Sequence, residues 1–149
     1  MEITYREVDF GEIDMFNLFA KWSNDPDIRP FTTPRFSEED YPKVHAIELM
    51  ASLMDKPYKH TYVVMVDQSP VAEFSIDMHF DHLVSNQDNV AWISIVIGVA
   101  EFRGVGLGVQ IMEFIEVEAR KLSAGIIELG VFEYNEKAIR LYKKLAINR

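Results

Sequence analysis

Cysteine is absent from all 149 residues of the sequence. This absence excludes disulfide bridges, thiolate nucleophiles, and zinc or iron–sulfur centres that are held by thiolates. Any chemistry that the protein performs must therefore rest on other groups.

Long apolar segments are also missing from the chain. No run approaches the roughly 20 apolar residues that a membrane-spanning helix requires. The first ten residues, MEITYREVDF, carry acidic side chains and lack an apolar core of signal-peptide length. We therefore expect a cytoplasmic protein that does not act at a membrane.

Positive charge is scarce as well. The 15 Lys and Arg residues against 24 Asp and Glu residues give a net charge of −9, which opposes binding to the phosphates of nucleic acids. This acidity either favours a cationic partner or substrate, or only keeps the protein in solution. Apolar residues make up 48% of the sequence, and a chain of this length predicts one globular domain over residues 1–149.

The order of apolar patterns predicts an α/β fold with a mixed sheet. Period-two patterns indicate strands and 3.6-residue patterns indicate helices. The expected strands are residues 3–8, 58–67, 70–80, 90–99 and 126–132. The expected helices are residues 13–23, 40–56, 107–122 and 135–145, with Asp40 and Asn135 as N-caps. The turn between 58–67 and 70–80 is placed around Gln68 and Ser69, which makes these two strands an antiparallel hairpin.

A glycine-rich stretch joins the buried strand 90–99 to the helix that follows. In EFRGVGLGVQ the glycines are Gly104, Gly106 and Gly108, directly after Arg103. Unpaired N–H groups at a helix N-terminus attract anions, and glycines allow close approach and tight turns. The spacing matches neither a Walker A loop nor GxGxxG. It indicates either a phosphate or pyrophosphate site or a purely structural turn.

Two motifs resemble those of the GNAT N-acetyltransferase superfamily. FRGVGLG, residues 102–108, is similar to the superfamily's acetyl-CoA signature Arg/Gln-x-x-Gly-x-Gly/Ala, and YNEKAIRLYKKL, residues 134–145, is similar to its closing motif. The likeness covers at least residues 90–145. More loosely, KWSNDPDIRPF, residues 21–31, resembles the ribosomal-protein N-terminal acetyltransferase branch.

The resemblance implies a fold and a cosubstrate. The fold is a GNAT-like acyl-CoA N-acyltransferase fold, with a mostly antiparallel central sheet flanked by helices. The cosubstrate is acetyl-CoA, and no metal is implied. Its pyrophosphate would contact the loop residues Arg103, Gly104, Val105, Gly106, Leu107 and Gly108. Its pantetheine arm would pair with Ile97, Gly98 and Val99, with further contacts from Asn135 and Lys137.

The same resemblance implies transfer of acetyl to a primary amine of a small molecule or of a peptide or protein N-terminus. Tyr142 would be the general acid that protonates the departing CoA thiolate, unless it is only a packed aromatic residue. Glu73 is the first candidate for the general base. It shares a strand face with Asp77, whereas Ser94 stands where many relatives carry a carboxylate.

Other interpretations stay open. A non-catalytic acyl-CoA-binding or assembly module would keep the glycine loop without turnover. The sequence shows no counterpart of the superfamily's C-terminal strand pair, so we expect this pair to be absent, truncated or supplied by another subunit, as in a homodimer, or the sheet to end in an exposed edge. Trp22, Phe31 and Phe36 either shape an acceptor pocket or belong to the core. The residues Asp77, His79, Asp81 and His82 are better explained as polar loop residues than as metal ligands.

Overall fold

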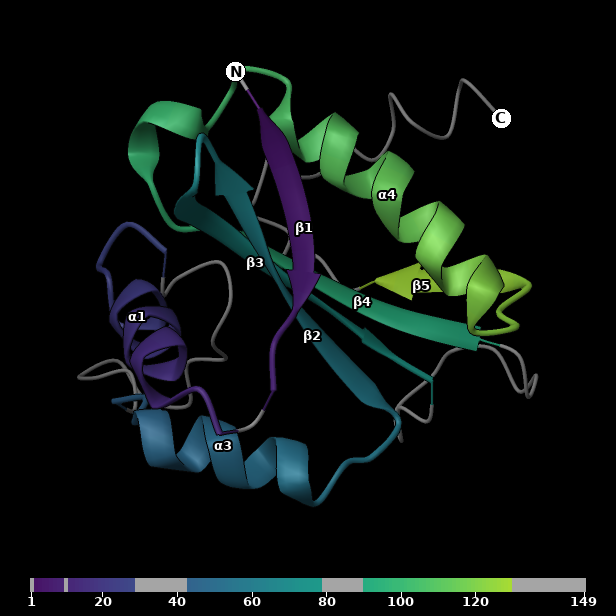
Figure 1. Cartoon of the computed structure of the whole chain (residues 1–149), viewed down its shortest axis with the longest axis horizontal. Helices are drawn as coiled ribbons and strands as arrows, with labels where there is room; N and C mark the ends of the chain where they lie inside the picture. Colours follow the sequence, from purple (N-terminus) through teal and green to yellow (C-terminus); the bar gives the residue numbers. More distant parts are fainter. Residues whose placement is uncertain (1, 10, 29–42, 79–89, 130–149) are drawn as a thin grey trace.

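The computed structural model describes residues 2–9, 11–28, 43–78 and 90–129 (Figure 1). Within these residues, five strands form one sheet in the order β1-β2-β3-β4-β5. The strands are β1 (Ile3–Glu7), β2 (Lys59–Val66), β3 (Ser69–Asp77), β4 (Val90–Ile97) and β5 (Ile126–Leu129). The helices are α1 (Ile13–Ser23), α3 (Ala46–Met54), the short 3-10 helix η1 (Ala100–Phe102) and α4 (Leu107–Lys121).

Strand pairing confirms the predicted mixed sheet. β1 to β4 pair in antiparallel fashion, whereas β4 and the described part of β5 run parallel, from Val90 opposite Ile126 to Ile93 opposite Leu129. The predicted helix 135–145, the end of strand 126–132 and any C-terminal strand pair lie outside the described residues. No helix in the described part of the chain is long and apolar enough to cross a membrane.

The hairpin between β2 and β3 turns one residue earlier than predicted. Asp67 and Gln68 are the turn residues, with φ angles of 49° and 70°, and Val66 pairs with Ser69 across the turn. Two successive positive φ angles are those of a type I′ turn, whose twist matches that of the flanking strands. Ser69 therefore belongs to β3, and the prediction that placed it in the turn was wrong.

The helix predicted over residues 40–56 begins later, at Ala46, because residues 43–45 are not helical. The side chain of Asn24 explains this difference. Its Nδ2 donates to the Val44 carbonyl at 2.7 Å, and its Oδ1 accepts from the Val44 N–H at 2.8 Å. Both backbone groups of Val44 are thereby bonded at the end of α1, so they are not part of a helix. The proposed cap, Asp40, lies outside the described residues.

Helices cover both faces of the sheet, with α4 on one face and α1 and α3 on the other (Figure 1). Alternate residues of β3 divide between these faces. Phe74 and Ile76 join the core cluster that contains Ile111 and Ile115 of α4. On the opposite face, Val63 of β2 packs with residues of α1. Glu73 and Ser75, which flank Phe74 on β3, therefore face α1 and α3.

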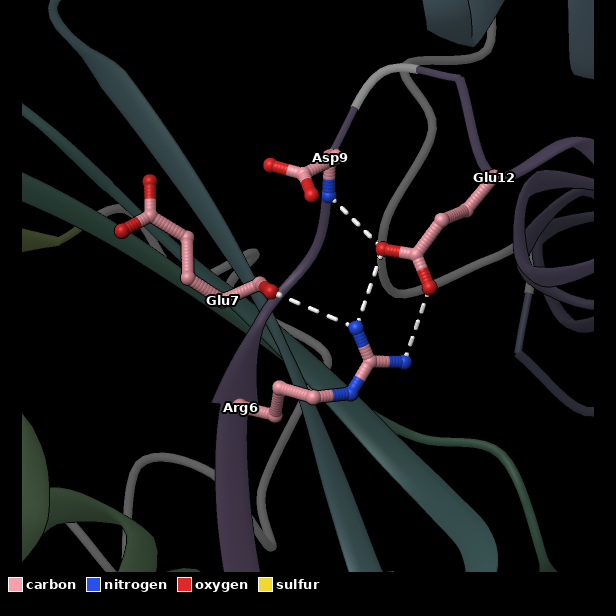
Figure 2. Close-up of polar contacts among 4 residues, drawn as sticks. All are labelled: Arg6, Glu7, Asp9 and Glu12. Atoms are coloured by element: carbon pink, nitrogen blue, oxygen red, sulfur yellow. Dashed lines mark hydrogen bonds and ion pairs between the residues drawn. The ribbon is translucent and has the colours of Figure 1, made fainter.

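An ion pair fixes the connection between β1 and α1 (Figure 2). Arg6 contacts both carboxylate oxygens of Glu12, with Nη1 at 3.0 Å from Oε2 and Nη2 at 2.9 Å from Oε1. Glu12 Oε2 also accepts the Asp9 N–H at 2.8 Å, and Arg6 Nη1 reaches the Glu7 carbonyl at 3.5 Å. The hydrogen bond from Arg6 lowers the pKa of Glu12. One carboxylate thus ties a strand end to a helix start.

We expect Glu12→Gln to lower the free energy of unfolding at pH 7 by about 1 kcal/mol or less, because exposed ion pairs contribute little. The pKa of Glu12 is lowered from 4.5 in the fold, so its stabilisation is present above that value and is lost as pH falls through the folded pKa. Urea unfolding at pH 7 and pH 3 measures the difference. Glu101→Gln, at an exposed position, is the matched control. A difference that persists undiminished at pH 3 would contradict this assignment.

Candidate active site

The glycine-rich loop connects the end of β4 to the N-terminus of α4. Gly104 and Gly106 have φ angles of 74° and 89°, and Gly106 is the N-cap residue of α4. A Cβ at either position would meet nothing within 4 Å, so the chain requires glycine there for its left-handed backbone and not because neighbours are close. Gly108, in contrast, lies inside α4. Residues 104–106 are exposed to solvent.

Arg103 binds the backbone of β4. Its Nε donates to the Ile97 carbonyl at 3.0 Å, and Nη2 reaches the Gly98 carbonyl at 3.4 Å. Its own N–H donates to the Ala100 carbonyl at 3.1 Å. The guanidinium therefore fastens the loop to the strand end. The backbone N–H of Arg103, predicted to contact the pyrophosphate, already donates a hydrogen bond within the protein.

The end of β4 contains a bulge. The N–H groups of Gly98 and Val99, which directly follow β4, both donate to the Val71 carbonyl, at 2.9 and 3.2 Å, so two residues oppose one residue of β3. Gly98 lies against the ring of Trp22, where an added Cβ would overlap the indole. Pairing of β4 with the described part of β5 ends at Ile93. The sequence predicts that residues 97–99 separate from the strand 126–132. This prediction involves residues 130–132, which lie outside the described part of the chain.

Trp22 belongs to the core and not to an acceptor pocket. Its side chain is 5% exposed and packs with Phe19 and Ile28. Of the two roles left open for Trp22, the structure supports the core, because the ring is buried against Gly98 and does not line the cavity described next. The other two aromatic candidates, Phe31 and Phe36, lie outside the described residues.

A cavity of about 90 Å³ lies between the sheet and the helices α1 and α3. Apolar side chains form its helical walls. These are Phe16, Phe19, Leu49 and Leu53. Polar side chains of three adjacent strands form its floor. These are Lys59, Thr61, Glu73, Ser75 and Ser94.

The strand register brings the floor residues together. Ser75 pairs with Thr61 on one side and with Ser94 on the other, while Glu73 pairs with Val63 and Val96 in the next row. The hydroxyls of Ser75 and Ser94 are 2.6 Å apart. Ser94, at the position on β4 where many relatives carry a carboxylate, therefore holds a hydrogen-bonded hydroxyl. Glu73, on the neighbouring strand, is the carboxylate that lines this cavity.

Burial determines the electrostatics of the cavity. Burial raises the pKa of Glu73 to about 7, and the nearby Lys59 cation only partly opposes this shift. Burial also lowers the pKa of Lys59, and Lys56 adds to the effect, whereas Asp77 and Glu73 counteract it. A carboxylate with a pKa near neutrality can accept and return a proton under physiological conditions. The cavity can therefore support proton transfer.

Sequence reasoning identified Glu73 but missed Lys59 and the two phenylalanines of α1. Lys59 and Thr61 have the two-residue spacing of one strand face, and the hairpin pairs them with Asp77 and Ser75, on the strand that also carries Glu73. That signal was present in the sequence. Phe16 and Phe19 are core residues that also close the cavity, and a helical stripe alone does not distinguish these roles.

Residues 18–146 match the sequence model of the acetyltransferase (GNAT) family. The chain belongs to the GNAT acetyltransferase family. The match includes the glycine loop, the cavity strands and α4. The search of curated protein sequences found no match to this chain.

Solved structures share the GNAT chain's fold at low identity. AAC(6')-Ib in complex with Parmomycin and acetyl-CoA superposes with a TM-score of 0.74 at 17% identity, covering 97% of this chain and 81% of the other. AAC(6')-Iy with the bisubstrate analogue CoA-S-monomethyl-acetylneamine gives 0.70 at 11%, covering 97% and 90%. An N-acetyltransferase from Staphylococcus aureus Mu50 gives 0.70 at 15%, covering 98% and 83%. The mixed sheet flanked by helices is thus the GNAT fold, and the protein is a GNAT-type N-acetyltransferase.

Several predicted site residues of the GNAT chain lie outside the described part. They are Asn135, Lys137 and Tyr142, together with His79, Asp81 and His82. Within residues 2–9, 11–28, 43–78 and 90–129, no three His, Asp or Glu side chains are grouped so that they could hold a metal ion.

Substitution of Gly106 by alanine tests the left-handed loop. We expect Gly106→Ala to lower the free energy of unfolding by about 1–2 kcal/mol, the cost of a left-handed backbone for a residue with a Cβ. Gly11→Ala is the control, because Gly11 also has open space around it but no positive φ. Urea unfolding of both variants measures the difference. Equal stability of the two variants would show that the loop adopts another backbone conformation.

Proposed function

We propose that the protein transfers the acetyl group of acetyl-CoA to a primary amine, with Glu73 as the general base. The observation that carries this proposal is the half-buried carboxylate in a cavity beside the strand end from which the glycine loop departs. Glu73 pairs with Val96 of β4, two residues before Gly98. Donor loop and candidate base are thus supported by adjacent strands.

The loop after β4 would bind the pyrophosphate of acetyl-CoA. No backbone carbonyl of the described residues accepts a bond from the N–H groups of residues 104–109, and α4 directs the positive end of its dipole toward this loop. Gly104 and Gly106 leave the approach open. The bulge at Gly98 and Val99, next to Ile97, would hold the pantetheine arm by backbone pairing, as an added strand does. Asn135 and Lys137 would supply further contacts.

Glu73 would accept the proton that the amine must lose. An alkylamine has a pKa near 10, so its neutral form is disfavoured at pH 7 by about 4 kcal/mol. Once neutral, the nitrogen attacks the thioester carbonyl, the C–N bond forms and the C–S bond breaks. Tyr142 would protonate the CoA thiolate, the remaining excess proton of the nitrogen would restore the Tyr142 phenol, and Glu73 would release its proton to solvent. A base with a pKa of about 7 is matched to this task.

The acceptor would be a small-molecule amine or a peptide or protein N-terminus. The complexes of AAC(6')-Ib and AAC(6')-Iy carry amine-containing small molecules, which supports the first class. The resemblance of residues 21–31 to the ribosomal-protein N-terminal acetyltransferase branch supports the second.

Ligand binding tests the proposed cosubstrate. We expect CoA to raise the melting temperature, because a ligand that binds only the folded state stabilises it, and acetyl-CoA with a suitable amine to release free thiol. Gly106→Glu introduces a carboxylate at the loop and should abolish the shift, whereas Gly11→Glu places the same charge at another exposed glycine and should not. CoA binding without thiol release from any amine would favour the non-catalytic module.

Replacement of Glu73 tests the proposed base. We expect Glu73→Gln to lower kcat/KM by about 100-fold to 1,000-fold, while Glu48→Gln, on the exposed side of α3, leaves it unchanged. In the native enzyme kcat/KM should rise with pH through about 7, the pKa of Glu73, and Glu73→Gln should remove this rise. An unchanged pH profile would exclude Glu73 as the base.

Stability provides a second measurement on the same variant. The folded pKa of Glu73 is raised from 4.5 to about 7, so its ionisation opposes folding as pH increases across that interval. Relative to the native protein, Glu73→Gln should become progressively more stable from pH 5 to pH 8 in urea unfolding.

A further inference from the structure

We propose that Lys59 binds an anionic group of the acceptor, so that the acceptor is an amine that also carries a carboxylate, as an amino acid does. This inference rests on the proposed function, because it assigns the substrate class of the same cavity. It contrasts with the cationic acceptor that the net charge of −9 favours.

Lys59 lines the cavity together with Glu73. It begins β2 and pairs with Asp77, two rows of the sheet from the pair of Val63 with Glu73. Among the residues that the structure describes, none forms a side-chain hydrogen bond or an ion pair within 4.0 Å with the Lys59 ammonium. The cavity thus contains a cation that lacks a close counter-ion from the described residues.

This arrangement leaves the ammonium incompletely stabilised. Burial lowers the pKa of Lys59, and the attraction of Asp77 and Glu73 only opposes that shift in part. A buried charge without a close partner is costly, and a ligand group of opposite sign offsets that cost when it enters the cavity. A carboxylate does so directly, whereas a second ammonium would add repulsion.

The same cavity offers the complementary group for the amine. Glu73 and Lys59 attract each other but lie farther apart than an ion pair, so a ligand with both an amine and a carboxylate can extend between them. The helices contribute only apolar or hydroxyl side chains to the lining, namely Phe16, Phe19, Leu49, Ser52 and Leu53. These walls suit an apolar side chain on the acceptor.

Size supports a compact acceptor. The cavity volume of about 90 Å³ is several times the roughly 10–15 Å³ that a single water molecule needs in a cavity. It accommodates the amine and carboxylate end of a small molecule. Leucine is therefore a suitable probe, and leucinamide, which lacks the negative charge, imitates a peptide N-terminus.

The first measurement is binding without turnover. N-acetyl-leucine and N-acetyl-leucinamide are the two reaction products, and they differ in carrying a carboxylate or an amide. Calorimetry compares the affinities of the protein for them. We expect the native protein to bind the carboxylate at least 10-fold more tightly, and Lys59→Met to lose this preference. Lys56→Met should retain it, because Lys56 is exposed and outside the cavity lining. Lys59→Arg, which keeps the positive charge, should retain part of it.

The second measurement is turnover, as kcat/KM for leucine against leucinamide with acetyl-CoA. We expect leucine to be preferred about 10-fold, and Lys59→Met to reduce the ratio to about one by slowing leucine alone. Melting temperatures of Lys59→Met and Lys59→Gln establish that each variant is folded, and either folded variant decides the result.

The two measurements separate the two proposals. Equal binding of the acid and the amide, no binding of either, or a preference unchanged in Lys59→Met would overturn the assignment of Lys59. Preferred acetylation of leucinamide would overturn it too, while leaving acetyl transfer intact. A carboxylate preference that depends on Lys59, without acetylation of any amine, would support the anion site and refute the proposed function.

Discussion

The register of β2, β3 and β4 is the constraint on which the candidate site depends. Along these strands, successive side chains alternate between the α4 face and the face covered by α1 and α3. The pairs Thr61–Ser75 and Ser75–Ser94 place hydroxyls of three strands in one row. A slip of one residue would turn Glu73 into the apolar core beneath α4 and expose Phe74 in its place. The type I′ turn at Asp67 and Gln68, together with the one-residue shift in pairing between Val64 and Met65, fixes the register between β2 and β3 at the site.

The parts of this arrangement that follow from local pattern could be predicted from the sequence. Alternating apolar residues identified the strands, and the period of two placed Glu73 and Asp77 on one face. Contacts between residues far apart in the sequence determine the features that the local pattern did not predict. The start of α3 depends on the Asn24 amide bonded to Val44, and the burial of Trp22 depends on the missing side chain of Gly98. Neither contact leaves a periodic signal. The sequence pattern therefore gave a wrong start for α3 and left the role of Trp22 open between pocket and core.

Net charge and local charge lead to different expectations for the acceptor. The whole-chain charge of −9 acts over long distances and is screened by salt within about 10 Å. Inside the cavity the relevant charges are those of Lys59 and Glu73, with Asp77 and Lys56 acting on Lys59. A raised pKa leaves Glu73 partly neutral near pH 7, whereas Lys59 has no close counter-ion among the described residues. Over the dimensions of a small acceptor, local charges outweigh the global field.

The end of β4 couples the two halves of the proposed reaction. The Val71 carbonyl accepts two N–H groups from the bulge, and the Arg103 guanidinium binds the Ile97 and Gly98 carbonyls. The loop proposed to hold the pyrophosphate is therefore fastened to the strand beside Glu73. Because Gly98 also contacts Trp22, α1 shares this frame, and α1 supplies two walls of the cavity. The loop, the strand next to the proposed base Glu73 and the helix that lines the cavity thus meet around Gly98, and such a shared frame favours the preorganisation that acyl transfer between two bound substrates requires.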